Sequence, residues 1–449
     1  MTGAQAIINL LAFTVFTVGT LLVWPSRYNV PAVVNVPFVI TAYLIPIAIF
    51  PYAAIFSPQL VQQLTNLNAL GGAAMLAGIL IGARMKFGAR TLARYLPQVR
   101  NERDYQILSR RLRQALLFGV LGVAFCFLWM GMVPIFAAEP FMAKFFKGQY
   151  KEKYDQISIL YRLAQYAIVT FLPLGFTMAL ERRDLKLIAL VLASVGMMAL
   201  ALQRGLVAEA FLLCLTVWAT RSFGATLAVT IGSTLLWLIG SVIYLVLGMI
   251  EAQGDLVADL SHGTPDILDH LTFLGAFNPQ TDLTYGLTFF GGLIPGNFHY
   301  NPSIFSLAIT NPTGEISEIS SGGFRMPPSI WGYVAFSWPG VVLVCLLSGL
   351  IFGGTTVALK GMKQESSLTN KMLMVLWFQI IATFAANFYD MYYYNVVSIA
   401  FFLVVCVIRR RKSKPGGQRG QLIDPERVLP AANAFPSPGT PNVSANVVK

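Results

Sequence analysis

The chain has 449 residues, of which 56% are hydrophobic and 12% are charged. Soluble domains carry about 25% charged residues, so this composition excludes an ordinary soluble globular protein. The formal net charge of +12 is large enough for nucleic-acid binding, so its distribution along the chain has to decide between partners.

Basic residues are concentrated in segment 84–113 and again from Arg409 onward, and both segments flank long apolar stretches. Membrane proteins show this pattern because Lys and Arg are retained in cytoplasmic loops. The distribution therefore favours a membrane protein over a nucleic-acid-binding one. We place both basic segments in the cytoplasm and expect no nucleic-acid partner.

Successive apolar stretches predict an all-α polytopic membrane protein, because a helix needs about 20 apolar residues to cross a bilayer. Counting from segment 84–113 gives about 11 transmembrane helices, with the N-terminus outside and the C-terminus inside. The transmembrane domain then covers residues 1–414, and residues 415–449, rich in Pro, Gly, Asn and Ser, are expected to be a disordered cytoplasmic tail. The expected spans are approximately residues 5–24, 32–56, 67–83, 114–138, 160–180, 187–202, 206–219, 224–250, 329–358, 371–388 and 391–408.

Four tyrosines lie at or near the junction of the last two expected spans. Tyr389, Tyr392, Tyr393 and Tyr394 are predicted to form a belt at the outer membrane interface, where aromatic rings are enriched.

Residues 251–328 form a long polar loop between two apolar stretches, on the outer side of the membrane in this topology. The loop holds all three histidines, eight carboxylates and a single cation, Arg325. This concentration of ionisable groups makes it the expected place of the chemistry. Thr264 followed by Pro265 predicts a helix over 265–274. The apolar segments 273–277 and 287–295 are expected to lie in the membrane interface.

His262, Asp266 and His270 are spaced four residues apart, which on one continuous helix would align them for a metal ion. The helix start at Pro265 separates His262 from the other two. Ordinary loop residues are therefore the favoured interpretation, and we predict neither a metal nor a cofactor.

Two arginines are candidates for binding an anion. Arg204 lies between two apolar spans, where an unpaired cation is costly, so it either pairs with Glu209 or grips a phosphate group. Arg325 follows a glycine pair that permits close approach of a ligand to the backbone. Glu315 and Glu318 precede it and would act as acid or base if burial raised their pKa values; the alternative is a solvated turn.

Two stretches of the sequence resemble the Wzy-type O-antigen polymerases, which join oligosaccharide repeat units in bacterial envelopes. One is ALQRG at 201–205, similar to the arginine that this family places between two mid-chain helices. The other is LIPG at 293–296 followed by SGGFRMPPS at 321–329, similar to the family's long periplasmic loop and its entry to the next helix. Many relatives carry a glutamate at the start of that helix, where this chain has Tyr333.

The resemblance implies a GT-C-like membrane glycosyltransferase of the bacterial inner membrane, with a periplasmic active site. It would transfer a growing glycan from undecaprenyl pyrophosphate to the next carrier-linked repeat unit, in O-antigen, enterobacterial-common-antigen-like or exopolysaccharide synthesis. Its partners would be lipid-linked oligosaccharides and membrane lipids, with a chain-length regulator and a flippase as further candidates. The expected pyrophosphate-binding residues are Arg204, Arg325 and Lys147, and the expected catalytic bases are, in order, His299, Glu318 and Glu315.

Two alternative functions remain open. An O-antigen ligase would use similar cations but transfer the glycan to lipid A-core. A transporter or flippase for a lipid-linked glycan belongs to another class, and it predicts internal repeats and charged residues within the spans. The ionisable residues concentrate in the outer loops instead, which favours an enzyme.

Overall fold

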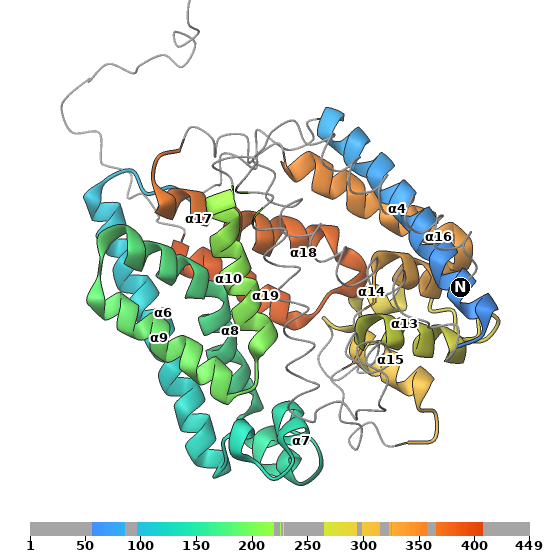
Figure 1. The fold of residues 1–449 in the computed structure, drawn as a ribbon, viewed down its shortest axis with the longest axis horizontal. Helices are drawn as coiled ribbons and strands as arrows, with labels where there is room; N and C mark the ends of the chain where they lie inside the picture. The colour runs from blue at the N-terminus through green and yellow to red at the C-terminus, as the bar shows by residue number, and fades with distance from the viewer. Residues whose placement is uncertain are drawn as a thin grey trace, which may run out of the picture. The chain divides into compact units, whose positions relative to one another are not determined.

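The computed structural model describes residues 56–85, 97–219, 225, 228, 265–293, 299–314, 323–324, 326–356 and 365–406 (Figure 1). All the regular structure in these residues is helical, apart from one isolated β-bridge between Gly292 and Tyr392. The expected span 5–24 and the tail 415–449 lie outside the described residues, as do nearly all of the expected spans 32–56 and 224–250.

Five of the described helical stretches are long and apolar enough to cross a membrane, and two shorter apolar helices accompany them. The prediction of an all-α membrane protein is confirmed, while the count of 11 spans stays a prediction. The longer helices are α4 (Pro58–Met85), α6 (Glu102–Met130), α8 (Lys151–Arg182), α9 (Leu185–Leu200), α10 (Arg204–Ala219), α13 (Pro265–Ala276), α16 (Pro328–Thr356) and α19 (Tyr393–Cys406). The shorter ones are α7 (Pro140–Phe145), α14 (Leu287–Gly291), α15 (Pro302–Thr310), α17 (Leu368–Trp377), α18 (Thr383–Ala386) and the 3-10 turns η3 (Pro134–Phe136), η4 (Gly148–Tyr150) and η7 (Phe388–Asp390), with a π-helical turn, Phe378–Ala382, after α17.

Helix α6 begins 12 residues before the expected start of its span, for a local reason. Asn101 is its N-cap, because the Asn101 side chain accepts a hydrogen bond of 2.8 Å from the Asp104 backbone N–H. Glu102 and Asp104 then place negative charge in the first turn, where the helix dipole favours it. The second half of the basic segment 84–113 is therefore helical and continues directly into the membrane span.

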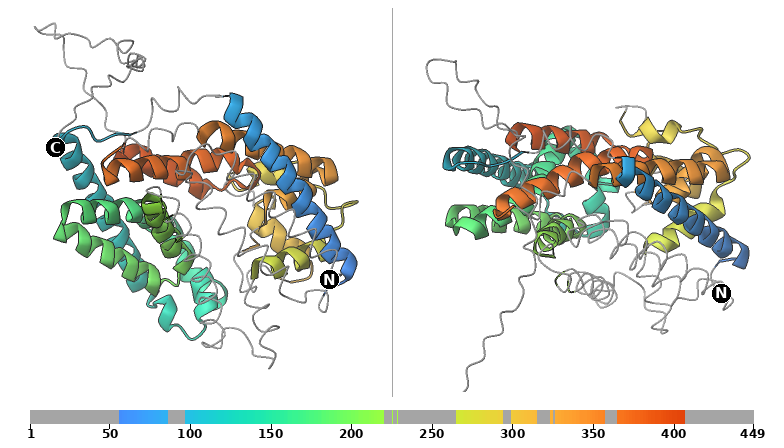
Figure 2. Two further views of the ribbon diagram at one scale, coloured as in Figure 1. Left: turned by 45° about the horizontal axis from the view of Figure 1, so that its top comes forward. Right: turned by 90° about the horizontal axis from the view of Figure 1, so that it is seen from above.

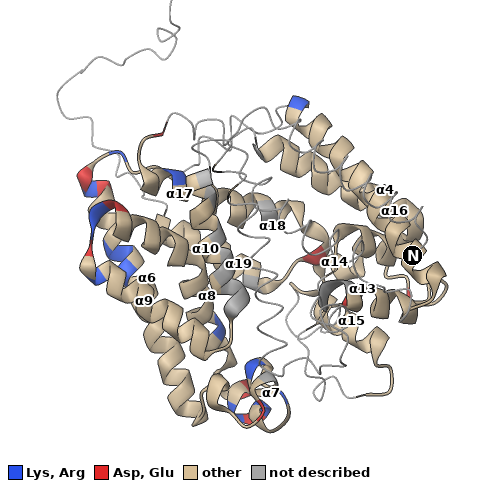
Figure 3. Ribbon diagram, in the orientation of Figure 1, with Lys and Arg blue, Asp and Glu red and all other residues tan. Residues whose placement is uncertain are grey.

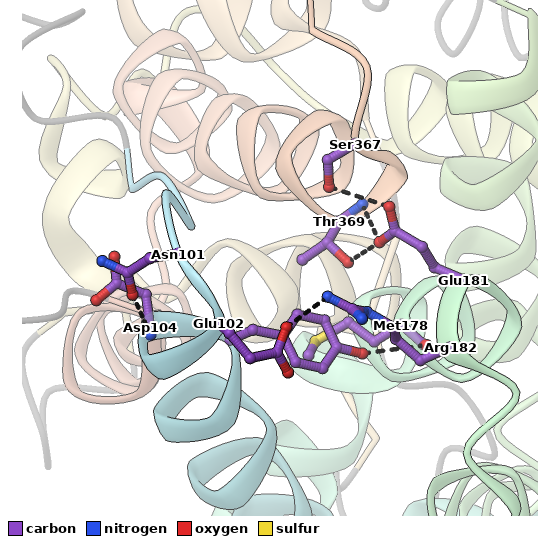
Figure 4. A network of polar contacts seen from close by, with 9 residues as sticks. Asn101, Glu102, Asp104, Met178, Glu181, Arg182, Ser367 and Thr369 are labelled. Carbon is purple, nitrogen blue, oxygen red and sulfur yellow. Dashed lines mark hydrogen bonds and ion pairs between the residues drawn. The ribbon is translucent and has the colours of Figure 1, made fainter.

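A network of polar contacts holds the ends of α6, α8 and α17 together (Figure 4). The Glu181 carboxylate on α8 accepts hydrogen bonds from the backbone N–H groups of Leu368 and Thr369, each 3.0 Å, and from the hydroxyls of Ser367 and Thr369. A carboxylate at this position satisfies free N–H groups at the α17 N-terminus. On α8, Arg182 forms a 2.8 Å ion pair with Glu102.

The same end of the bundle includes α9 and α19. Arg113 on α6 forms an ion pair with Asp184, the N-cap of α9, and Arg111 donates a hydrogen bond of 3.2 Å to the Val404 carbonyl of α19. We call these joined ends the basic end, and the opposite ends of the same helices the outer end. In Figure 3, Lys and Arg gather in the α6–α9 turns and beside α7, whereas the helix bodies are nearly uncharged. The basic end is the end that the positive-inside rule would assign to the cytoplasm.

Glycines set the close packing of α4 against the second part of α16. A Cβ added at Gly78 would meet the Leu346 carbonyl oxygen at 2.2 Å, and one added at Gly353 would meet the Ile79 carbonyl oxygen at 2.3 Å. Both helices carry glycines four residues apart, a pattern that lets membrane helices approach backbone to backbone. All views keep α4 beside α16 (Figure 2).

Helix α16 corrects the expected ninth span, 329–358, because it is two helices rather than one. Phe336 and Ser337 have non-helical dihedral angles, and Ser337 has φ 57°. A Cβ at Gly332 would meet the Gly340 carbonyl oxygen at 2.5 Å, which requires the first segment to fold back on the second. Only residues 338–356 are then left to cross the membrane, and at ~1.5 Å per residue they span nearly 30 Å.

The glycine contact between α4 and α16 yields a stability prediction. Gly78→Ala and Gly353→Ala should each lower the free energy of unfolding by about 1–3 kcal/mol, because the added methyl group meets backbone atoms. Gly196→Ala on α9 is the matched control, since a Cβ there has no neighbour within 4 Å. This control should be neutral or slightly more stable, because alanine favours helices. Thermal unfolding of the purified protein in lipid nanodiscs measures all three, and equal stability of the Gly78 and Gly196 variants would contradict the packing.

Candidate functional site

A polar cluster lies at the outer end, where the turn η7 meets α14 and α15. It consists of Ser303, Asp390 and Tyr392, and we call it the Asp390 cluster. Asp390 ends η7, and the Ser303 hydroxyl lies 2.9 Å from the Tyr392 hydroxyl, which in turn is hydrogen-bonded to the Asp390 carboxylate. The Asp390 Oδ1 atom is buried and has no hydrogen-bond partner among the described residues.

Local sequence explains how Ser303 reaches this position. Asn301 caps α15 by accepting a hydrogen bond of 3.1 Å from the Ser303 backbone N–H, and Pro302 occupies the first helical position. The Ser306 hydroxyl, one turn further on, accepts a hydrogen bond of 3.2 Å from the Phe324 backbone N–H. This hydrogen bond attaches Phe324, near the end of the loop 251–328, to α15.

Three glycines bring the backbones of these segments close together. A Cβ at Gly292 would meet the Met391 carbonyl oxygen at 2.3 Å, and one at Gly291 would meet the Tyr300 carbonyl oxygen at 2.0 Å. Gly323 has φ 111° and a Cβ there would meet Ser303 at 2.4 Å. A side chain at any of these positions would push the segments apart, so the glycines are required for the cluster to form.

The surroundings of Asp390 are apolar. Burial raises the pKa of the Asp390 carboxyl to about 6, and the hydrogen bond from Tyr392 opposes that rise. Burial and the neighbouring carboxylate raise the pKa of Tyr392 well above its usual value. Helices α14, α15 and α16 contain no Asp, Glu, Lys, Arg or His within their bounds. Asp390 can thus change its protonation state near neutral pH.

A second cluster, of aromatic and basic residues, lies at the outer end of α8. Phe146 stacks on Tyr154 with 3.9 Å between ring centroids, and Tyr161 packs edge-on against Phe146. Arg162 donates from Nε to the Tyr154 hydroxyl at 2.7 Å. Lys147 directly follows Phe146, and burial lowers its pKa. We call these five residues the Arg162 cluster.

The two clusters lie on the outer side of one contact between α8 and α19. Phe171 of α8 and Phe401 of α19 are in ring contact, and both helices run from the outer end to the basic end. Arg162 in α8 and Tyr392, directly before α19, each lie nine residues from this contact in the direction of the outer end.

The structure brings some of the expected site residues together. Lys147 belongs to the Arg162 cluster, and the α9–α10 turn at Ala201 packs in the same apolar core as Phe146. Arg204 is the first residue of α10, directly after this turn, while its side chain lies outside the described part. His299 is exposed, with its ring 4.7 Å from that of Tyr300. Glu315, Glu318 and Arg325 lie outside the described residues.

The predicted helix and the apolar segments of the loop 251–328 can be compared with the structure. Helix α13 confirms the helix predicted to start at Pro265, and His270 on it is fully buried. His262 and the Asp266 side chain lie outside the described part. The segments expected in the membrane interface are partly in the protein core instead, because Phe273, Phe277 and Phe289 are buried.

The prediction of an interfacial aromatic belt between the last two spans is wrong for two of its four tyrosines. Tyr389 is buried, and Tyr392 is bonded within the Asp390 cluster. Tyr393 is exposed as expected, and the Tyr394 side chain lies outside the described part.

The sequence analysis did not select Asp390 or Arg162 as site residues, although a sequence feature singles out each of them. Asp390 is the only carboxylate between Glu365 and Asp424, and Arg162 lies inside an expected apolar span. An ionisable residue in or beside a membrane span is a functional candidate by default. Tyr333, where many of the resembled proteins have a glutamate, is buried against Phe277 and Trp338.

Comparison of the chain with known proteins does not name a family. No family model, no curated protein and no solved structure matches it.

The burial of Asp390 predicts a gain of stability on removing its charge. Because the pKa of Asp390 is about 6 when folded and 3.8 in the usual exposed state, its ionisation opposes folding. This penalty is absent below about pH 4, grows as pH rises through 6 and is complete above it. Asp390→Asn should therefore be more stable than wild type by about 1–3 kcal/mol at pH 7.5, and no more stable at pH 4.

Thermal unfolding at several pH values measures this difference. Asp155→Asn, at an exposed position beyond the first turn of α8, is the control and should not change stability at either pH. An Asp390→Asn variant that is no more stable than wild type at pH 7.5 would mean that Asp390 is solvated.

Proposed function

We propose that the protein polymerises lipid-linked oligosaccharide repeat units, as a glycosyltransferase of the bacterial inner membrane with its active site on the periplasmic side. The growing glycan leaves undecaprenyl pyrophosphate and is joined to a hydroxyl group of the next carrier-linked repeat unit. The observation that carries this proposal is a buried, titratable carboxylate at the outer end of a membrane helix bundle that also carries basic residues at this end.

The reaction makes two chemical demands, and the outer end contains groups suited to each. Negative charge develops on the departing pyrophosphate, so fixed cations near it lower the barrier. Lys147 and Arg162 lie in one cluster at this end, and Arg204 begins the helix that follows the adjoining turn. The acceptor hydroxyl loses a proton, for which a carboxylate with a pKa near neutrality is suited.

Charge placement favours an enzyme over a transporter. The basic-end contacts join helix termini, and the bodies of the described spans are nearly uncharged (Figure 3). Arg162 lies about three turns into α8, toward its outer end. A transporter that moves a charged carrier lipid needs polar groups near the middle of the membrane. A ligase shares the proposed chemistry, and only its acceptor differs.

The test is a polymerisation assay with the purified protein in lipid, supplied with undecaprenyl-pyrophosphate-linked repeat units and no nucleotide or metal. Wild type should produce a ladder of lengthened glycans. Arg204→Ala and Arg325→Ala should each reduce the rate by about 10²–10³-fold, the usual cost of losing one fixed charge-stabilising group. Arg103→Ala is the matched control, because this exposed arginine lies at the basic end, and it should retain activity.

Each other outcome identifies a different function. Transfer to lipid A-core without a ladder would make the protein a ligase. No transfer from a verified substrate, together with movement of the lipid-linked glycan across the bilayer, would make it a transporter. A ladder from both arginine variants would keep the polymerase and discard these two residues from its site.

A further inference from the structure

We infer that Asp390 is the catalytic base of the transfer reaction, and that Tyr392 and Ser303 position its carboxylate. This inference rests on the proposed function and assigns the proton-accepting role to a residue outside the long loop. The sequence had favoured His299, Glu318 and Glu315 for this role.

Asp390 is held rigidly, as a base in a fixed site has to be. The bridge between Gly292 and Tyr392 and the hydrogen bond of 2.9 Å from the Tyr393 N–H to the Gly292 carbonyl fix the backbone on its C-terminal side. On its N-terminal side, the Asp390 N–H donates to the Asn387 carbonyl at 3.0 Å. The residue therefore cannot swing away from the cluster without breaking backbone contacts.

Three other described carboxylates have structural partners that account for them. Glu181 and Asp184 accept backbone N–H groups at helix N-termini, and Asp282 accepts a hydrogen bond of 2.8 Å from the Asn278 N–H within its own turn. Asp390 accepts no backbone N–H from any described residue, and its Oδ1 atom is buried. Burying a carboxylate that caps nothing opposes folding, so a functional reason for keeping it is expected.

The Tyr392 hydroxyl links the carboxylate to Ser303. It is hydrogen-bonded to Asp390 and lies 2.9 Å from the Ser303 hydroxyl. In this arrangement Tyr392 holds one face of the carboxylate and stabilises its ionised form. This leaves Oδ1, the buried atom without a partner among the described residues, to accept the proton of the substrate hydroxyl group.

The transfer step balances with these groups. Asp390 takes the proton of the acceptor hydroxyl as the acceptor oxygen forms a bond to the anomeric carbon of the donor sugar. The bond from that carbon to the pyrophosphate oxygen breaks, and its electron pair leaves with undecaprenyl pyrophosphate. Asp390 then releases its proton to water, which restores the ionised carboxylate.

Among the described residues, few groups bear on the pH dependence of this step. Tyr392 is the titratable residue that interacts with Asp390. The elements packed around the turn, which are α14, α15, α16 and α18, carry no charged side chain within their bounds. The acid limb of the activity profile is therefore expected to follow Asp390 itself.

The experiment measures kcat/KM for ladder formation against pH, with undecaprenyl-pyrophosphate-linked repeat units as donor and acceptor. Wild type should lose activity as pH falls below about 6, where Asp390 becomes protonated. Asp390→Asn should lose about 10²–10⁴-fold at pH 7.5, the range for removing a general base. Its unfolding temperature shows whether the variant remains folded.

Tyr392→Phe separates positioning from a merely structural role. Its hydrogen bond lowers the pKa of Asp390, so its removal should move the acid limb to higher pH. Tyr285→Phe, at an exposed position before α14, is the matched control and should leave the limb in place. A structural role for Tyr392 would change the rate at all pH values without moving the limb.

The outcomes separate this inference from the proposed function. Full activity of a folded Asp390→Asn variant in an assay where wild type makes a ladder would overturn the inference alone. Absence of a ladder from wild type would overturn the proposed function, and the inference with it.

Discussion

The Glu181 carboxylate at the N-terminus of α17 is the contact on which the geometry of the outer end depends. It accepts two backbone N–H groups and two hydroxyls, in a position where the helix dipole also favours a negative charge. From Leu368 the chain continues through α17, a π-helical turn and α18 to Asp390. At ~1.5 Å per residue this path covers roughly 30 Å, the thickness of a hydrocarbon core. Fixing the helix at the basic end therefore sets the height of Asp390 at the other.

Close backbone packing holds the segments of the outer loop together, as polar contacts hold the helices together at the basic end. Glycines let α4 approach α16, let the first part of α16 fold back on the second, and let the segments at Gly291, Gly292 and Gly323 converge on Ser303 and Met391. The backbone N–H groups of Thr284 and Tyr285 bond to the free carbonyls of Val334 and Ala335 where the first part of α16 ends. In a low-dielectric setting such groups need partners, so the fold-back also determines where the preceding loop lies.

Much of this architecture follows from local sequence. Apolar length predicted α4, α6, α8, α9 and α10, and Thr264 with Pro265 predicted the start of α13, because these signals act within one or two turns. The reversal at Phe336 and Ser337 could not be predicted in this way. Phe336 is not a typical turn former, and the contact that stabilises the reversal joins Gly332 to Gly340.

The candidate site was only partly visible in the sequence. Charge concentration drew attention to residues 251–328, but the Asp390 cluster draws two of its three members from the turn before α19. The local sequence of that turn predicts an interfacial aromatic segment. It carries no signal that Tyr392 contacts Ser303, 89 residues earlier. Long-range pairing of this kind requires either the fold or a model of helix packing.

The central claim is that the Asp390 cluster and the basic end face opposite sides of the membrane. Gln280→Cys, in the exposed turn before α14, and Arg103→Cys, on α6, report the two sides when the four native cysteines are replaced. Labelling with a membrane-impermeant maleimide in intact, outer-membrane-permeabilised cells should modify Cys at 280 alone. Cys at 103 should react only after the inner membrane is opened. Equal labelling of both positions in intact cells would place the two ends on one side and contradict the account.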